Sequence, residues 1–203
     1  TDSSAAFAAW ANSKGAFPSV LPGRVAHYSF DAIADEKVTN ADSAEGAGIQ
    51  VESPLFEPGK IGQAVTLNGE NGLKFPKVGH FKRTDPFTLS LWIQPPATLA
   101  PRSVVIHRSK APADAGSRGY EILLEKGRVA FGLHYLWPGA SIKVVTQDSV
   151  APSAWTHVAV TYDGSSRAAG VTVFVNGTAA KLEVVRDGLF KDVTYEGTEP
   201  DLT

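Results

Sequence analysis

The alternation of apolar and polar residues is clearest between residues 156 and 175. Residues 156–162 (THVAVTY) and 171–175 (VTVFV) are rich in β-branched and aromatic side chains, which suit a pleated, half-buried strand. Asp163-Gly164 separates the two runs, and Asn176-Gly177 follows the second, as is typical of a tight hairpin turn. This stretch therefore predicts an antiparallel meander.

Shorter runs of the same kind lie on both sides of the meander. We expect further strands at 24–31, 62–67, 73–75, 87–94, 103–108, 120–124, 128–134, 142–146 and 181–185, and a long polar loop at 31–48. In 87–94 (FTLSLWIQ) the alternation turns Trp92 away from the face that Leu89 and Leu91 share. Many short strands separated by turns predict an all-β fold, an antiparallel two-sheet β-sandwich of the jelly-roll type.

The first residues have a different composition. Residues 5–11 are rich in Ala, with Phe7 and Trp10 on one face of a helix, and prolines follow. We interpret 1–22 as a short helical or irregular segment, a linker or the tail of a preceding domain, and 23–203 as the sandwich. The chain begins with Thr1 and contains no Met, which we interpret as a piece of a longer, processed protein.

Composition excludes several classes of function. There is no Cys, so neither disulfides nor thiolate metal sites are available. The 19 Lys and Arg against 21 Asp and Glu give a net charge of −2, without the basic stripe that nucleic acids require. No apolar run approaches the roughly 18 residues of a membrane span. We expect neither a nucleic-acid partner nor a membrane span.

Several motifs carry a family resemblance. In order they are GRVAHYSFD, GKIGQAVTLNG, FTLSLWIQP, YEILLEKGRVAFGLHY, WTHVAVTYDG and VTVFVNG. Over residues 23–203 this order resembles the laminin G-like, pentraxin-like jelly rolls of the concanavalin A-like lectin/glucanase superfamily. Within it the chain is most similar to modules embedded in large secreted bacterial multidomain proteins.

The resemblance implies a function as well as a fold. It implies a non-catalytic module that recognises a polysaccharide or glycoprotein outside the cytoplasm, whether secreted, periplasmic or on the cell surface. The alternative is a structural or protein-interaction domain that positions neighbouring domains of the parent protein and has no sugar site. A fold alone does not decide between them.

The sequence departs from the family pattern at its end. In the family, the chain continues past the segment equivalent to 201–203 into a last strand beside the first strand. That strand is absent here, so residues 24–31 would expose a sheet edge. We expect either a truncated domain or an edge covered by a partner or by the N-terminal segment.

Candidate ligand-binding residues follow from the aromatic positions. Sugar sites stack aromatic rings against pyranose faces, and His134, Tyr135 and Trp137 precede the Pro138-Gly139 turn. Trp92 is a further candidate on the face opposite Leu89 and Leu91. The arginines near residues 109–118 are candidates for an anionic sugar, or else part of a solvated basic loop; they are Arg102, Arg108 and Arg118.

Catalysis has weaker support. Glu121 and Glu125 are four residues apart in a strand, about 13 Å, whereas glycosidase carboxyl pairs lie roughly 5–10 Å apart. We interpret them as exposed strand-face charges and expect no enzyme. No HxH or HExxH pair occurs, so no zinc or catalytic role is expected for the five histidines, which are His27, His80, His107, His134 and His157.

A calcium ion is the one cofactor that the resemblance implies. Calcium takes six to eight hard oxygen ligands. The candidates are turn and loop residues without EF-hand spacing, namely Asp31, Asp42, Asn68, Glu70 and Asn71. Ordinary turns contain the same residue types, so turn formation is the alternative explanation.

Overall fold

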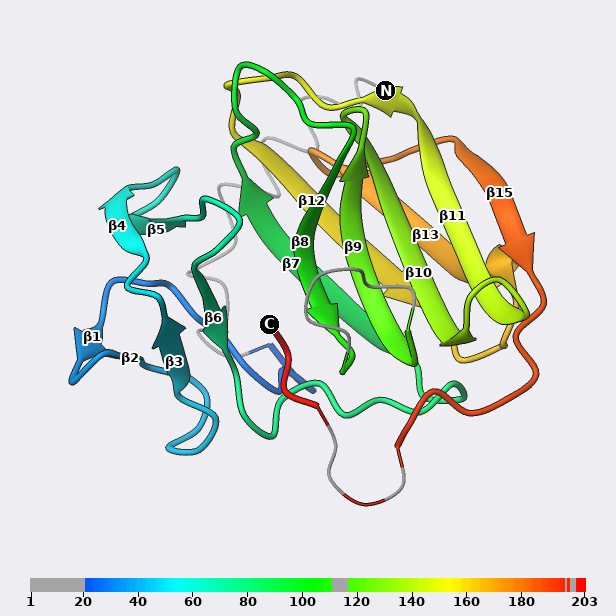
Figure 1. Ribbon diagram of the computed structural model, residues 1–203, viewed down its shortest axis with the longest axis horizontal. Helices are drawn as coiled ribbons and strands as arrows, with labels where there is room; N and C mark the ends of the chain where they lie inside the picture. Colours follow the sequence, from blue (N-terminus) through cyan, green and yellow to red (C-terminus); the bar gives the residue numbers. More distant parts are fainter. Residues whose placement is uncertain (1–20, 111–116, 196, 198–199) are drawn as a thin grey trace, which may run out of the picture.

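Two antiparallel sheets pack face to face in the structure, a computed structural model that describes residues 21–110, 117–195, 197 and 200–203 (Figure 1). The five-stranded sheet has the order β15-β11-β10-β9-β8. Its strands are β8 (Arg102–Arg108), β9 (Gly119–Glu125), β10 (Arg128–Leu136), β11 (Ala140–Ser149) and β15 (Leu182–Asp187). The predicted two-sheet antiparallel sandwich is confirmed. The helical or irregular segment predicted at the N-terminus falls almost entirely in residues 1–20, outside the described residues.

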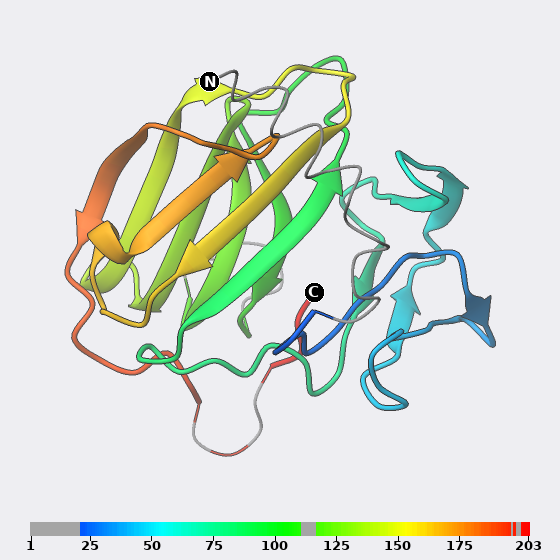
Figure 2. The same cartoon turned by 180° about the vertical axis from the view of Figure 1, so that it is seen from behind.

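The second sheet has four strands in the order β14-β13-β12-β7, and Figure 2 shows it from the side opposite to Figure 1. Its strands are β7 (Phe87–Ile93), β12 (Thr156–Tyr162), β13 (Val171–Val175) and β14 (Thr178–Ala179), with a short 3-10 helix at Ala168–Gly170. β12 pairs with β7 on one side and with β13 on the other, so the predicted meander is present. No described helix is long and apolar enough to cross a membrane.

Small sheets lie beside the sandwich, on the left of Figure 1. One has the order β1-β2-β3-β6 and the other pairs β4 with β5. Their strands are β1 (Ile33–Ala34), β2 (Lys37–Val38), β3 (Gly48–Val51), β4 (Leu55–Pro58), β5 (Gln63–Thr66) and β6 (Gly72–Lys74). The loop predicted for 31–48 therefore contains two short strands and the start of a third.

Two tight turns set the register of the main hairpins. Asn176 and Gly177 have φ of 49° and 80° between β13 and β14. Lys126 and Gly127 have φ of 52° and 80° between β9 and β10. Two consecutive positive φ values match the right-handed twist of the flanking strands. These turns fix which residues of each strand face the core.

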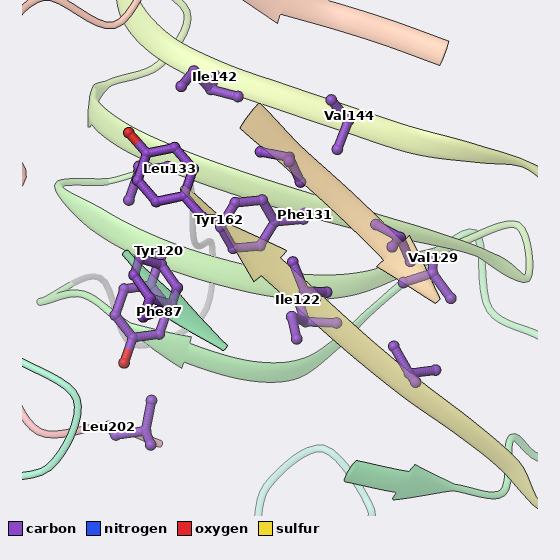
Figure 3. Packing of buried hydrophobic residues seen from close by; sticks show 14 of the residues in the cluster. Phe87, Tyr120, Ile122, Val129, Phe131, Leu133, Ile142, Val144, Tyr162 and Leu202 are labelled. Atoms are coloured by element: carbon purple, nitrogen blue, oxygen red, sulfur yellow. The ribbon is translucent and has the colours of Figure 1, made fainter. Parts of the chain in front are cut away.

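The core is centred on Phe87, where β7 begins (Figure 3). Its ring stacks on Phe81 with centroids 4.4 Å apart and lies 5.3 Å from Tyr120, 5.5 Å from Tyr162 and 6.3 Å from Phe131. These contacts join β7 and β12 of one sheet to β9 and β10 of the other. Offset and edge-on ring pairs of this kind add to the free energy gained by burying apolar area.

Residues 24–31 do not form the predicted first strand. Their hydrogen bonds go largely to side chains and loops: the His27 backbone N–H donates to Asn40 Oδ1, and the Tyr28 hydroxyl donates to the Gly46 carbonyl. Phe30 has a φ of 64°, which ends any extended run. Apolar and polar residues alternate in this segment as they do in strands, but no neighbouring strand pairs with it. The prediction that 24–31 is an exposed sheet edge is therefore wrong.

The last residues lie between β6 and β8. Thr203 and His107 exchange two backbone hydrogen bonds of 2.7 Å, and the Phe75 backbone N–H donates to the Leu202 carbonyl at 2.8 Å. Residues 202–203 therefore pair with β8 and with the residue that follows β6, not with residues 24–31. The expected absence of a last strand stays a prediction.

The substitution Phe87→Ala should reduce the free energy of unfolding by about 3–5 kcal/mol, because it removes the ring that both sheets share. The matched control is Phe190→Ala, since Phe190 is 65% exposed and Phe87 only 7%. Denaturant unfolding followed by tryptophan fluorescence measures both. Equal losses in the two variants would contradict the central position of Phe87.

The Arg24–Asp42 ion pair should make stability depend on pH. Arg24 Nε and Nη2 each donate to an Asp42 oxygen at 2.6 Å, and this hydrogen bonding lowers the pKa of Asp42 from its ordinary 3.8. Stabilisation by a carboxylate of lowered pKa is complete above the ordinary value and is lost as the pH falls through the folded value. We expect Asp42→Asn to lower the Tm at pH 7 and to lower it less below pH 3.8.

The control for this pair is Asp35→Asn, at an exposed position in the turn between β1 and β2. Thermal unfolding between pH 2.5 and 7 measures the two variants against the unsubstituted protein. A Tm difference for Asp42→Asn that stays the same down to pH 2.5 would show that charge is not its cause.

Candidate functional site

The outer face of the five-stranded sheet carries the most concentrated polar chemistry of the described chain. The pairing register places Glu121 of β9 opposite Gly132 of β10, and Gly132 opposite Lys143 of β11. On the edge strand β8, His107 is opposite Glu121. Burial lowers the pKa of His107, and the nearby Glu121 carboxylate opposes this shift. Burial therefore favours the neutral form of His107.

His134 and Glu121 form a buried pair across the two central strands. His134 Nε2 lies 3.2 Å from Glu121 Oε1, and the residues are 1% and 3% exposed. The His134 ring lies over Gly132, where an added Cβ would meet Nε2 at 2.2 Å. The pair therefore depends on the absence of a side chain at position 132. The prediction that Glu121 is an exposed strand-face charge is wrong.

Trp137 lies above this pair, in the β10–β11 turn. Its ring meets the His134 ring edge-on, with centroids 5.6 Å apart at 79°, and Lys143 Nζ lies 5.3 Å from its centroid. Lys143 is in turn held by Glu125, with Nζ 2.5 Å from Oε1. Trp137 remains 38% exposed. These contacts support the ring, and its exposed part is accessible from solvent.

Tyr135 lies next to this turn but belongs to a different set of contacts. The Arg118 guanidinium carbon is 4.1 Å from the centroid of the Tyr135 ring, and Lys191 Nζ is 4.8 Å from it. Tyr195 lies on the other side of Arg118, with the guanidinium carbon 5.2 Å from its centroid. Tyr135 is partly buried against the core and contacts cations at the end of β10, whereas Trp137 contacts Lys143 in the turn that follows.

Trp92 lies elsewhere. It is 41% exposed on β7 of the four-stranded sheet, where its ring contacts His157 at 5.2 Å and Lys60 Nζ at 5.6 Å. His157 Nε2 is 2.9 Å from Ser90 Oγ on the same face. The two sheets point their outer faces in opposite directions, so Trp92 and Trp137 do not belong to one site.

Arg108 is also apart from Trp137. It is the last residue of β8, is opposite Tyr120 in the register and is fully buried. Of the seven residues predicted as ligand candidates, the structure brings His134 into contact with Trp137 and Arg118 into contact with Tyr135, with His134 buried beneath Trp137. Lys143 was missed, although the alternation along 140–149 and a correct hairpin register would have placed it beside Gly132. Lys191 and Tyr195 follow the last strand, β15, in a segment whose sequence has no pattern that would predict a binding role for them.

The residues predicted to bind calcium already have partners within the chain. Both Asp42 oxygens accept hydrogen bonds from Arg24, and Asp31 Oδ1 accepts one from the Gln63 backbone. The side chains of Asn68 and Asn71 bond to backbone groups of their own turn, which also contains Glu70. Among the described residues, no group of three or more His, Cys, Asp or Glu could hold a metal ion. These residues do not fit a calcium site, and calcium binding stays a prediction.

Gly132→Ala should displace His134 from Glu121 and reduce the free energy of unfolding by about 1–3 kcal/mol, because a buried polar pair then loses its hydrogen bond. Gly139→Ala is the control: an added Cβ there meets only the Leu136 carbonyl, at 3.7 Å. Denaturant unfolding measures both, and equal stability of the two variants would show that Gly132 is not needed for the pair.

The chain was compared with protein families, curated proteins and solved structures. The family model described as the concanavalin A-like lectin/glucanases superfamily, Laminin_G_3, matches residues 67–196. No curated protein matches the chain significantly. Among solved structures, the chain is similar to domain 4 of AbnA, a GH43 extracellular arabinanase from Geobacillus stearothermophilus, in complex with arabinotriose. The identity is 21% and the TM-score 0.53, over 87% of this chain and 80% of that one.

A second solved structure is the binding domain of Paraclostridial Mosquitocidal Protein 1. It is 15% identical with a TM-score of 0.62, over 84% of this chain and 42% of that one. At these identities the solved structures show a shared fold alone. The family model covers more than half of the chain, and the protein therefore belongs to the concanavalin A-like lectin/glucanase superfamily, in its laminin G-like family.

Proposed function

We propose that this domain is a non-catalytic carbohydrate-recognition module whose binding surface is the end of the five-stranded sheet around Trp137. The observation that carries the proposal is the fixed and half-exposed Trp137 ring. His134 and Lys143 both contact the ring, and Lys143 is itself bonded to Glu125. The ligand is a polysaccharide or the glycan of a glycoprotein.

The physical basis is the match between a flat aromatic ring and the apolar face of a sugar ring. Burying such a ring yields free energy from its apolar area. A ring that is already held in place loses little conformational entropy when the ligand binds. Polar groups beside the ring can then bond to sugar hydroxyls and determine orientation. Lys143 and the end of β10 supply such groups beside Trp137.

The comparisons support the proposal at the level of fold. Domain 4 of the arabinanase was solved with arabinotriose bound, and the second similar structure is a binding domain. The chain shares their sandwich, and it carries an exposed aromatic ring in the turn between β10 and β11. Both structures show that a sandwich of this kind can belong to a binding domain, and neither identifies the sugar that this chain binds.

The proposal assigns no catalytic step to this domain. A glycosidase needs a pair of carboxyl groups on opposite sides of the scissile bond. On this face Glu121 is buried against His134 and Glu125 is bonded to Lys143, so each carboxylate stabilises the sheet. We also propose an extracytoplasmic location, because polysaccharides and glycoproteins are found there.

An interaction domain without a sugar site is the second candidate. The observation in its favour is a group of exposed apolar side chains on and beside the β4–β5 hairpin. Leu55, Ile61 and Leu67 are 64%, 76% and 48% exposed. Exposed apolar residues gathered on one element mark contact surfaces in many proteins, and on this hairpin they would suit a neighbouring domain of a longer chain. If the protein binds no glycan on an array, the result would favour this candidate function.

Trp137→Ala should reduce the affinity for the bound glycan at least tenfold, because it removes the stacking ring and leaves the fold intact. A glycan array with the purified protein identifies the ligand, and isothermal titration calorimetry measures its Kd. Trp92→Ala is the matched control, since its ring is similarly exposed but lies on the other sheet. Binding that survives in Trp137→Ala, or that is lost equally in both variants, would contradict the proposed site.

A further inference from the structure

Three cations and two tyrosine rings alternate in a stack at the end of β10. Lys191 lies over Tyr135, Arg118 lies between Tyr135 and Tyr195, and Lys110 lies over Tyr195. The distances from each cation to its ring centroid are 4.8 Å for Lys191 and Tyr135, 4.1 Å for Arg118 and Tyr135, 5.2 Å for Arg118 and Tyr195, and 4.5 Å for Lys110 and Tyr195. We call these five residues the cation–tyrosine stack.

The stack carries three positive charges. Among the described residues, no carboxylate lies within ion-pair distance of Lys110, Arg118 or Lys191. Aromatic rings attract cations through their quadrupole, worth about 0.5–2 kcal/mol a pair, but they do not neutralise the charge. The whole chain has a net charge of −2, so the three neighbouring cations form a local positive patch on a slightly negative protein.

The side chains of the stack are held in place and still reachable. Arg118 Nη1 donates to the Thr194 carbonyl at 3.3 Å, and the Tyr195 hydroxyl donates to the Arg118 carbonyl at 2.9 Å. Both lysines are exposed, and Arg118 is half-buried. An arginine fixed between two rings presents its remaining N–H groups in a planar fork, which matches the geometry of a carboxylate.

We propose that the cation–tyrosine stack binds the carboxylate of a uronic acid, so that the module recognises an acidic polysaccharide. The stack lies at the end of β10, and Trp137 is in the turn that follows this strand, so both belong to the same end of the five-stranded sheet. Trp137 contacts the apolar face of one unit, and the stack binds the carboxylate of another unit of the same sugar chain. This inference rests on the proposed carbohydrate-recognition function and adds the charge of the ligand to it.

The experiment compares charged and neutral forms of the same sugar chain. Isothermal titration calorimetry of the full 203-residue protein uses oligogalacturonate and oligomannuronate, each against its neutral methyl ester. We expect at least one acidic oligomer to bind tenfold or more tightly than its ester, and its affinity to fall as NaCl rises from 50 to 300 mM, since salt screens exposed charges. A sulfated oligosaccharide completes the panel.

The variant Lys110→Gln/Lys191→Gln removes two exposed charges with little risk to folding. It should lower the affinity for the acidic oligomer at least tenfold and leave the affinity for the ester unchanged. The control is Lys60→Gln, because Lys60 lies over Trp92 on the other sheet and forms the same kind of cation–ring pair. Adding Arg118→Gln should remove the remaining preference for the acid.

Each contrary result has a defined meaning. Equal affinity for acid and ester, with both lost in Trp137→Ala, would overturn the uronate proposal and leave the carbohydrate-recognition function in place. Tighter binding of the sulfated oligomer than of either uronate would overturn the assignment to a carboxylate. If no oligosaccharide of this panel binds but the glycan array identifies a neutral ligand, the uronate proposal fails and the proposed function stands; if the array is also negative, both fail.

Discussion

The packing of the two sheets around Phe87 is the constraint on which the rest of the structure depends. One ring contacts Tyr120 and Phe131 of the five-stranded sheet and Tyr162 of the four-stranded sheet. Because side chains alternate along a strand, a register that turns these residues inward also decides which residues face outward. In β9 it turns Glu121 and Glu125 to the outer face, and in β10 it does the same for Gly132 and His134. The candidate site is thus a consequence of the core.

The side chains on the outer face are arranged around Gly132, which has no side chain of its own. Gly132 leaves space for the His134 ring to reach Glu121, and the buried ring supports Trp137 from below. Lys143 completes the support from the neighbouring strand, and Glu125 holds Lys143. Trp137 is in the tight turn between β10 and β11, and its contacts go to side chains of these two strands, so the sheet supports the exposed ring. A binding surface built on strands keeps its geometry without a ligand, which lowers the entropic cost of recognition.

The sequence predicted the sandwich because its strands alternate strongly and its turns carry Asn-Gly and Lys-Gly pairs. Residues 24–31 alternate equally well and still form no strand, since pairing depends on a neighbour that a local pattern cannot show. The sequence also predicted that His134, Tyr135 and Trp137 lie together at the β10–β11 turn. It named Trp92 as a further candidate without relating it to these three, because alternation gives the face of a strand and not the sheet to which the strand belongs. Lys191 and Tyr195 join the site from a segment without regular structure, and only the tertiary fold brings them to Arg118.

The central claim is that a sugar contacts the exposed face of Trp137, on the outer face of the five-stranded sheet. The most direct test is a titration of the 15N-labelled protein with neutral and acidic oligosaccharides, followed by NMR through the indole N–H signals of its four tryptophans. The account predicts that the Trp137 signal shifts as the bound fraction rises, whereas the signal of Trp92, on the opposite sheet, stays in place. A bound sugar that shifts Trp92 and leaves Trp137 unchanged would contradict it.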